Sequence, residues 1–254
     1  MENKVQKFSK QCITLTFSNV VENSVGMEQI GDINNCKPFS IEKLKEIYDN
    51  FNGEKELINL TLNETDRPNN VVYEPAALLV LRNFYNNDSK ILFEKLIGSE
   101  WDTKALMDGK VKNKIARYNL CFADFNQEPD YSNGKGRVIQ IDSIDELFNL
   151  QTQIEKLTGY SKLNAEANFY YNVDKCGIFW HTDKERNIVI GCRLGNSMDL
   201  CFNWFYRSKP VGKKFTINLN DGDLYIMSEK AVGYNDRGPL ILKHSAGSSK
   251  YTSL

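Results

Sequence analysis

Short runs of alternating hydrophobic and polar residues fill the chain from about residue 165 onward. These runs lie at 165–173, 177–181, 187–194, 199–206, 213–219, 223–227 and 240–244. Turn-forming sequences rich in Asp, Asn and Gly separate them, as at 174–177, 220–222 and 235–238. Many short strands at this spacing are typical of an antiparallel sandwich or jelly roll. A βαβ enzyme is a poor fit, because no crossover helices are available between the runs.

The first hundred residues have a mixed pattern. Alternation over 12–17 predicts a half-buried strand, and a single apolar face over 41–48 predicts a helix that begins after Ser40. Pro75 is typical of the first turn of a further helix, for which the apolar positions are Leu78, Leu79, Leu81 and Phe84. Asp88 can cap another helix, which Gly98 ends.

The middle of the chain leads from this mixed pattern into the strands. Residues 111–122 have an extended pattern, 127–137 a turn-rich one, and 138–141 that of a short strand. A capping box at 143–146 predicts a helix that ends at Gly159. We therefore expect a mainly β fold with some helix, divided into a mixed α/β N-terminal extension (1–109) and a mainly β domain (110–254).

Length and composition are those of an ordinary globular enzyme: 254 residues, 41% hydrophobic and 26% charged. The net charge of −1 means that any nucleic-acid binding must rest on a local basic groove. Neither a signal peptide nor a membrane span is predicted. The six cysteines show no zinc-ligand spacing, so free thiols and a cytoplasmic location are expected.

The candidate chemistry depends on the two histidines of the chain. His181 and Asp183 are two positions apart at the end of a predicted strand, and His244 ends another. Alternate strand residues face the same side, so all three side chains can meet at one ion. Two imidazoles and a carboxylate leave open positions that suit Fe(II), although a hydrolytic zinc site would use the same ligand types.

The order of motifs around these residues resembles the AlkB-like branch of the 2-oxoglutarate/Fe(II)-dependent oxygenases. The similarity is carried by 168–171, 177–186, 222–229 and 243–247, and it covers roughly residues 110–254. It implies a double-stranded β-helix, or jelly roll, with the metal at one mouth. It also implies a dioxygenase that uses O2 and 2-oxoglutarate, with 110–141 as a lid over the substrate.

The resemblance also implies residues that bind 2-oxoglutarate. Asn168 and Tyr170 fall near the family's asparagine and tyrosine, with Tyr171 or Asn172 as alternatives because the spacing is two residues longer here. Lys250 matches the first of two family arginines, and no second one follows it. Arg193 is the rival for the distal carboxylate, unless it faces solvent.

The expected substrate is a nucleic-acid base, which the enzyme would demethylate or hydroxylate. By analogy with the family, Lys112, Lys114, Arg117 and Tyr131 are candidates for contacts with phosphates and a base. A solvated, charged edge strand is the alternative interpretation of the lysines. Two further hypotheses are a protein side-chain hydroxylase of the prolyl type and a non-catalytic jelly-roll binding module.

Overall fold

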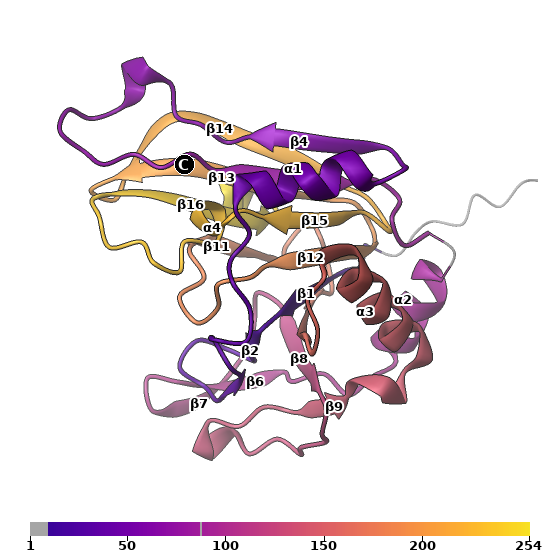
Figure 1. Cartoon of the computed structure of the whole chain (residues 1–254). Helices are drawn as coiled ribbons and strands as arrows, with labels where there is room; N and C mark the ends of the chain where they lie inside the picture. Colours follow the sequence, from indigo (N-terminus) through magenta and orange to yellow (C-terminus); the bar gives the residue numbers. More distant parts are fainter. Residues whose placement is uncertain (1–9, 87) are drawn as a thin grey trace, which may run out of the picture.

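Two largely antiparallel sheets form the framework of the structure. The computed structural model describes residues 10–86 and 88–254 (Figure 1). The large sheet has eight strands in the order β4 (Lys55–Asn59), β5 (Ala77–Leu81), β15 (Leu224–Met227), β12 (Ile190–Gly195), β1 (Cys12–Ser18), β10 (Asn164–Tyr170), β8 (Tyr118–Ala123) and β9 (Val138–Gln140). The small sheet has four, in the order β11 (Gly177–His181), β16 (Leu240–Gly247), β13 (Met198–Tyr206) and β14 (Lys209–Leu219). Only the β8–β9 pair is parallel in these sheets.

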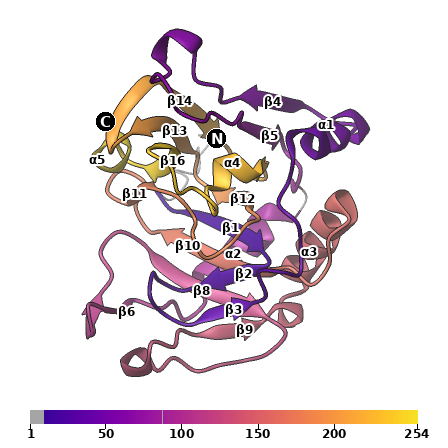
Figure 2. The same cartoon turned by 60° about the vertical axis from the view of Figure 1, so that its left-hand side comes forward.

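Two hairpins and five α-helices complete the described structure. The hairpins are β2 (Val20–Glu22) with β3 (Gln29–Gly31) and β6 (Lys104–Met107) with β7 (Lys110–Asn113). Figure 2 shows β2, β3 and β6 gathered with β8 and β9 at the end of the molecule opposite β4. The helices are α1 (Ile41–Asn50), α2 (Ser89–Ile97), α3 (Asp145–Thr158), α4 (Glu229–Val232) and α5 (Ser249–Thr252). No helix of the described ranges has the length and apolarity needed to cross a bilayer.

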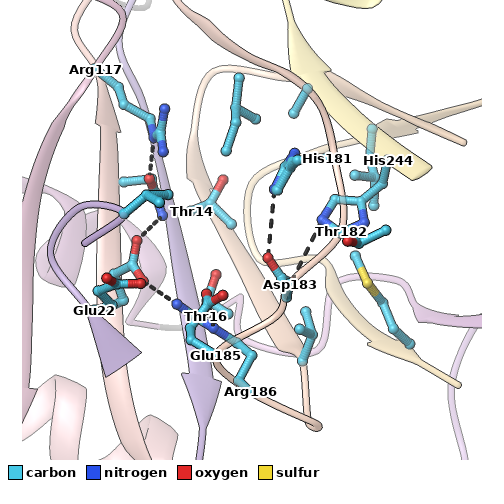
Figure 3. Close-up of a pocket in the computed structure, with 18 of the residues that line it drawn as sticks. Thr14, Thr16, Glu22, Arg117, His181, Thr182, Asp183, Glu185, Arg186 and His244 are labelled. Carbon is cyan, nitrogen blue, oxygen red and sulfur yellow. Dashed lines mark hydrogen bonds and ion pairs between the residues drawn. The ribbon is translucent and has the colours of Figure 1, made fainter. Parts of the chain in front are cut away.

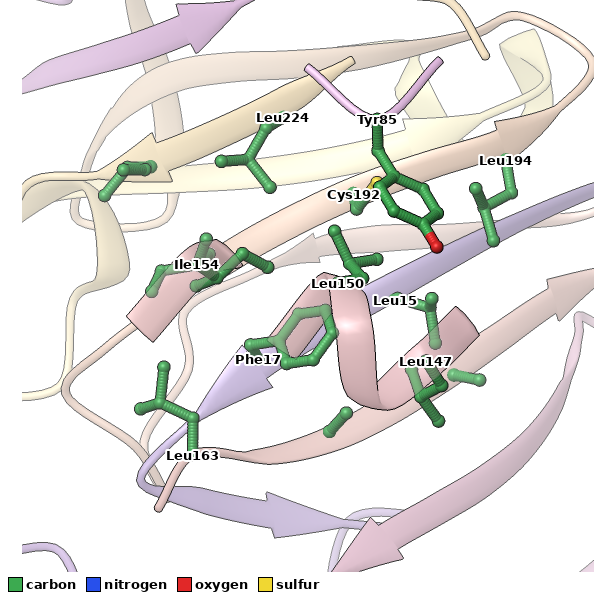
Figure 4. Close-up of a cluster of buried hydrophobic side chains, with 14 of the residues drawn as sticks. Leu15, Phe17, Tyr85, Leu147, Leu150, Ile154, Leu163, Cys192, Leu194 and Leu224 are labelled. Carbon is green, nitrogen blue, oxygen red and sulfur yellow. The ribbon is translucent and has the colours of Figure 1, made fainter. Parts of the chain in front are cut away.

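The inner strands of the large sheet, from β5 to β8, bury both of their faces, and the two faces differ in chemistry. Apolar side chains on one face pack against α1, α2 and α3, as Leu15, Phe17, Leu150 and Ile154 do in Figure 4. The opposite face looks toward the small sheet and a second apolar core that contains Phe202 and Trp204. On that face, β1, β10 and β12 carry polar residues, and these form the wall of a cavity.

β1 shows how this arrangement changes the interpretation of an alternating pattern. The prediction of a strand at 12–17 is confirmed, but both faces are buried. Its odd-numbered residues, such as Ile13 and Leu15, face the helices, and Thr14 and Thr16 line the cavity. Alternation therefore marks two different buried environments here, rather than one core and one solvent face.

The segment after Pro75 corrects a predicted helix. Residues 77–81 form strand β5, all five of them buried, between β4 and β15. Leu79 packs in the helix-side core, and Leu78 packs in the core between the sheets. A short apolar run buried on both faces lacks the polar positions that would separate a strand from a helix.

The other main expectations agree with the structure, which is mainly β with some helix. The helices beginning after Ser40 and Asp88 are confirmed as α1 and α2. α3 also forms and ends at Gly159, which is left-handed at φ 77°, but the predicted capping box does not form. The hydroxyl of Ser143 donates to the carbonyl of Gln140 instead.

The N-terminal segment is not a separate layer. β1, β4 and β5 all come from residues 1–109, yet they belong to the large sheet, and β1 lies between β10 and β12. Strands from both sides of residue 109 therefore share one sheet and its two cores, in place of the expected extension and domain.

Candidate metal site and its cavity

The small sheet brings His181, Asp183 and His244 together. His181 ends β11 and lies directly across from His244 on β16, after a register irregularity between Ile178 and His181. Asp183 follows in the loop, where its N–H donates to the carbonyl of Val232. One ligand atom from each of the three residues lies within 4.8 Å of the others. The sequence prediction that these side chains converge is confirmed (Figure 3).

The orientation of the three side chains fits a metal ion. The carboxylate oxygens of Asp183 are 3.6 Å from Nε2 of His181 and 3.6 Å from Nε2 of His244. Nδ1 of His181 is 2.7 Å from the carbonyl oxygen of Phe179. A carbonyl only accepts, so Nδ1 donates this hydrogen bond, and Nε2 is the ring nitrogen that is left on the side of Asp183 to bind a metal. Burial lowers the pKa of His244, which favours the neutral ring that a metal needs.

A cavity of about 150 Å³ lies next to the triad, between the two sheets. The strand register places cavity residues in rows across the large sheet. Thr14 on β1 pairs with Asn168 on β10 and with Arg193 on β12. The next row contains Glu166, Thr16 and Gly191. A Cβ on Gly191 would lie 2.0 Å from the Tyr225 ring. Only glycine at 191 therefore leaves room for this ring in the cavity wall.

Arg193 is a buried cation without a buried anion beside it. Its side chain lines the cavity and the residue is 1% exposed. Nη1 donates to Oγ1 of Thr14 at 2.6 Å and to Sγ of Cys12 at 3.1 Å. Nε has no hydrogen-bond partner, and no carboxylate of the described residues forms an ion pair with this guanidinium. Such a group is an anchor for an anionic ligand.

Asn168 and Tyr170 also line the cavity, as expected for contacts with a cosubstrate. Asn168 is held in place, since its Oδ1 accepts from Nε of Arg117 at 2.5 Å and its Nδ2 donates to Glu166 at 3.0 Å. The two alternatives lie elsewhere. Tyr171 stacks on Tyr118, and Asn172 accepts a hydrogen bond within its own turn.

Lys250 does not line the cavity, in contrast to its expected role. It belongs to the short helix α5, and its Nζ lies 5.3 Å from the centroid of the neighbouring Tyr251 ring. The prediction rested on the position of Lys250 in the sequence, six residues after His244. In the structure this lysine lies in α5 and is exposed. Of the two rivals for the distal carboxylate, Arg193 is the one in the cavity.

Three of the four residues expected to contact the substrate are occupied elsewhere. Lys112 is exposed and pairs with Asp108 at 2.8 Å, and the hydroxyl of Tyr131 donates to Asp102 at 2.6 Å. Lys114 lies beyond the end of β7 at Asn113, and its side chain is buried. Only Arg117 of the four lines the cavity.

Lys114 is enclosed by amide oxygens. Its Nζ donates to Oδ1 of Asn23 at 2.6 Å and to Oδ1 of Asn119 at 2.8 Å. Burial lowers its pKa to about 8. This lysine therefore joins the end of β2 to the start of β8 by hydrogen bonds, and it is not available for a phosphate.

An ion-paired cluster in the cavity wall escaped the sequence analysis. Nη2 of Arg186 is 2.5 Å from Glu166, and Nε of Arg186 is 2.8 Å from Glu185. Burial would raise the pKa of Glu166, but the Arg186 guanidinium outweighs it and holds that pKa below its usual value. The polar residues at alternate positions of 12–17 and 164–170 were the available signal for this polar wall, and the pattern at 12–17 predicted only a half-buried strand.

Glu22 is a further carboxylate of the wall that sequence reasoning missed. It is 7% exposed and lines the cavity from the end of β2. Its Oε1 accepts a hydrogen bond from the N–H of Gly26 at 2.6 Å. Burial raises its pKa to about 7. No pattern in 20–22 marks it, because a three-residue strand is too short to show a period.

Comparison with known proteins finds a relative that matches nearly the whole chain. No model of a protein family matches the chain. It is 42% identical over 253 residues to a protein of Acanthamoeba polyphaga mimivirus named "Uncharacterized protein R156". The match covers 95% of this chain and 98% of the viral protein. The chain belongs to the family of that viral protein.

Proposed function

We propose that this protein is an Fe(II)- and 2-oxoglutarate-dependent dioxygenase that hydroxylates a C–H bond. The observation that carries the proposal is the pairing of two features in one cavity. One is the triad of His181, Asp183 and His244, and the other is the buried, unpaired guanidinium of Arg193. A metal ion and a dicarboxylate that binds it would use both.

The arrangement of strands supports a jelly-roll core of the AlkB-like type. Four strands of the large sheet, β10, β1, β12 and β15, are antiparallel neighbours. The four strands of the small sheet are antiparallel as well, and the cavity lies between the two sets. Under this proposal, the N-terminal strand β1 completes the larger half of the jelly roll.

Each group of the cavity has a defined task in the proposed reaction. His181, Asp183 and His244 would hold Fe(II), and Arg193 with Thr14 would bind the distal carboxylate of 2-oxoglutarate. Asn168 and Tyr170, which line the cavity from β10, would orient the cosubstrate. The bound metal and cosubstrate supply the oxidation, in which O2, 2-oxoglutarate and a C–H bond give C–OH, succinate and CO2.

The triad alone fits a zinc hydrolase equally well, and a jelly-roll binding module would need no metal. Arg193 favours the oxygenase over both, because neither alternative requires a buried anion anchor next to the metal ligands. The nucleic-acid substrate is supported less by the cavity, since Lys114 and Tyr131 are bonded internally. A protein side chain is the other candidate substrate.

Succinate formation tests the proposal. Purified protein supplied with Fe(II), ascorbate, O2 and 2-oxoglutarate is expected to form succinate slowly without any added substrate. His181→Ala removes a metal ligand, so we expect succinate formation to fall at least about 100-fold. Glu94→Ala, on the exposed face of α2, is the matched control and is expected to keep the wild-type rate.

Two results would refute the proposal. One is succinate formation by His181→Ala at the wild-type rate. The other is the absence of succinate in wild-type protein that binds Zn(II) and hydrolyses an ester, which would favour the hydrolase.

A further inference from the structure

Glu22 is the carboxylate of the cavity wall that has no cation. Glu166 and Glu185 are both paired with Arg186. Asp183 belongs to the metal-binding triad. Glu22 accepts only the backbone hydrogen bond from Gly26, and no cation of the described residues pairs with it. Figure 3 shows it across the cavity from the triad.

The charged residues that line the cavity show that Glu22 is an excess negative charge in it. Four carboxylates (Glu22, Glu166, Asp183 and Glu185) face three guanidinium groups (Arg117, Arg186 and Arg193). A divalent metal at the triad and a dianionic cosubstrate at Arg193 add charges that cancel. When Glu22 is ionised, the loaded cavity keeps one negative charge more than positive ones, and Glu22 is the group without a paired cation. Burial disfavours the charge of Glu22, and a cationic ligand beside it would stabilise the ionised carboxylate.

We propose that the substrate of this site carries a cationic nitrogen, the amine or guanidinium of a basic polypeptide side chain, which pairs with Glu22. This inference rests on the proposed oxygenase function and names its substrate class. The aliphatic stem of a lysine or arginine side chain supplies the C–H bonds to be oxidised. It enters past Val25, which also lines the cavity and is 89% exposed.

The neighbouring surface favours a polypeptide over a nucleic acid. Four of the six basic side chains of the lid segment (110–141) are already engaged. Lys112 pairs with Asp108, Lys114 is enclosed by amides, Lys135 pairs with Glu28, and Arg137 pairs with Glu100 and Glu128. Phosphates need several free cations along a groove, and the whole chain has a net charge of −1. A basic peptide is attracted by the same carboxylates that would repel a phosphate backbone.

Binding of matched peptides tests the inference. Isothermal titration of protein loaded with Mn(II) and 2-oxoglutarate would compare the capped tripeptide Gly-Lys-Gly with Gly-norleucine-Gly, which has the same stem without the amine. Wild-type protein is expected to bind the lysine peptide at least about tenfold more tightly, as a charge-assisted hydrogen bond to a buried carboxylate allows. Arginine and citrulline peptides form a second pair.

Glu22→Gln keeps the shape of the side chain and removes its charge, so the preference for the lysine peptide is expected to vanish. Glu100→Gln removes the same charge from an exposed carboxylate outside the cavity and is expected to keep the preference. Equal binding of both peptides to wild type, or an unchanged preference in Glu22→Gln, would overturn the inference. So would tight binding of a single-stranded oligonucleotide in place of either peptide.

Failure here is separable from failure of the proposed function. Substrate-free succinate formation by wild-type protein depends on the metal and 2-oxoglutarate, and not on the peptide. If succinate forms and the peptide preference is absent, only the inference on Glu22 is wrong. If no succinate forms, the oxygenase proposal itself is wrong.

Discussion

Among single residues, Arg193 is the one that distinguishes the proposed oxygenase site from a simple metal site. The protein encloses this guanidinium with a hydroxyl and a thiol, Thr14 and Cys12, and offers it no carboxylate among the described residues. A fully buried cation in this setting is unfavourable by itself. Its position in the cavity of the triad makes a dicarboxylate cosubstrate the natural counter-ion.

This assignment predicts which part of 2-oxoglutarate Arg193 recognises. 2-Oxopentanoate has a methyl group in place of the distal carboxylate. Wild-type protein is expected to prefer 2-oxoglutarate at least about 100-fold in substrate-free turnover, because the buried charge pair is lost with the analogue. In Arg193→Met the ratio of the two kcat/KM values is expected to approach one.

The ratio is informative even if the variant is less stable, since both values come from the same folded fraction. Arg193→Lys, which keeps a positive charge, is expected to restore part of the preference. A wild-type-like ratio in Arg193→Met would show that another group binds the distal carboxylate.

At the scale of elements, the alternation of residues along β1, β10 and β12 organises the site. Their apolar residues pack against the helices, and their polar residues form the cavity wall. The sequence predicted the strands after residue 165 and the convergence of the triad, because period and strand ends are local properties. It could not place Arg193 relative to Thr14, since that contact depends on the register of strands far apart in the chain.

The hairpin β2–β3 is held to β8 through the buried amine of Lys114, and this contact predicts a pH dependence. The pKa of Lys114 is lowered to about 8 in the folded protein, from an unfolded value near 10.5. Between these values the unfolded chain binds more protons, so this group makes stability rise with pH.

Urea unfolding of wild type and Lys114→Gln at pH 8 and at pH 10.5 measures the effect. The stability of wild type relative to the variant is expected to increase over this range by at most about 3 kcal/mol. The comparison with the variant cancels other groups that titrate in the same window. A constant difference across the range would mean that Lys114 keeps an ordinary pKa.

At the scale of the whole molecule, the chain forms two sheets whose shared cavity holds the candidate chemistry. Residues near both ends meet in it: Thr14 on β1, and His244 on β16. The sequence alone favoured a division near residue 109, because the change from mixed to alternating patterns occurs there. The insertion of β1 between β10 and β12 overrides that division, and no local pattern records which strands become neighbours.

The most direct test of the central claim is anaerobic binding of Fe(II) and 2-oxoglutarate, followed by visible absorption. Chelation of Fe(II) by a 2-oxoacid gives a charge-transfer band that neither component shows alone. Wild-type protein is expected to develop this band with about one Fe(II) per chain, and His244→Ala is expected to lack it. A band of equal intensity in His244→Ala, or none in folded wild-type protein, would contradict the assignment of this site to an iron-dependent oxygenase.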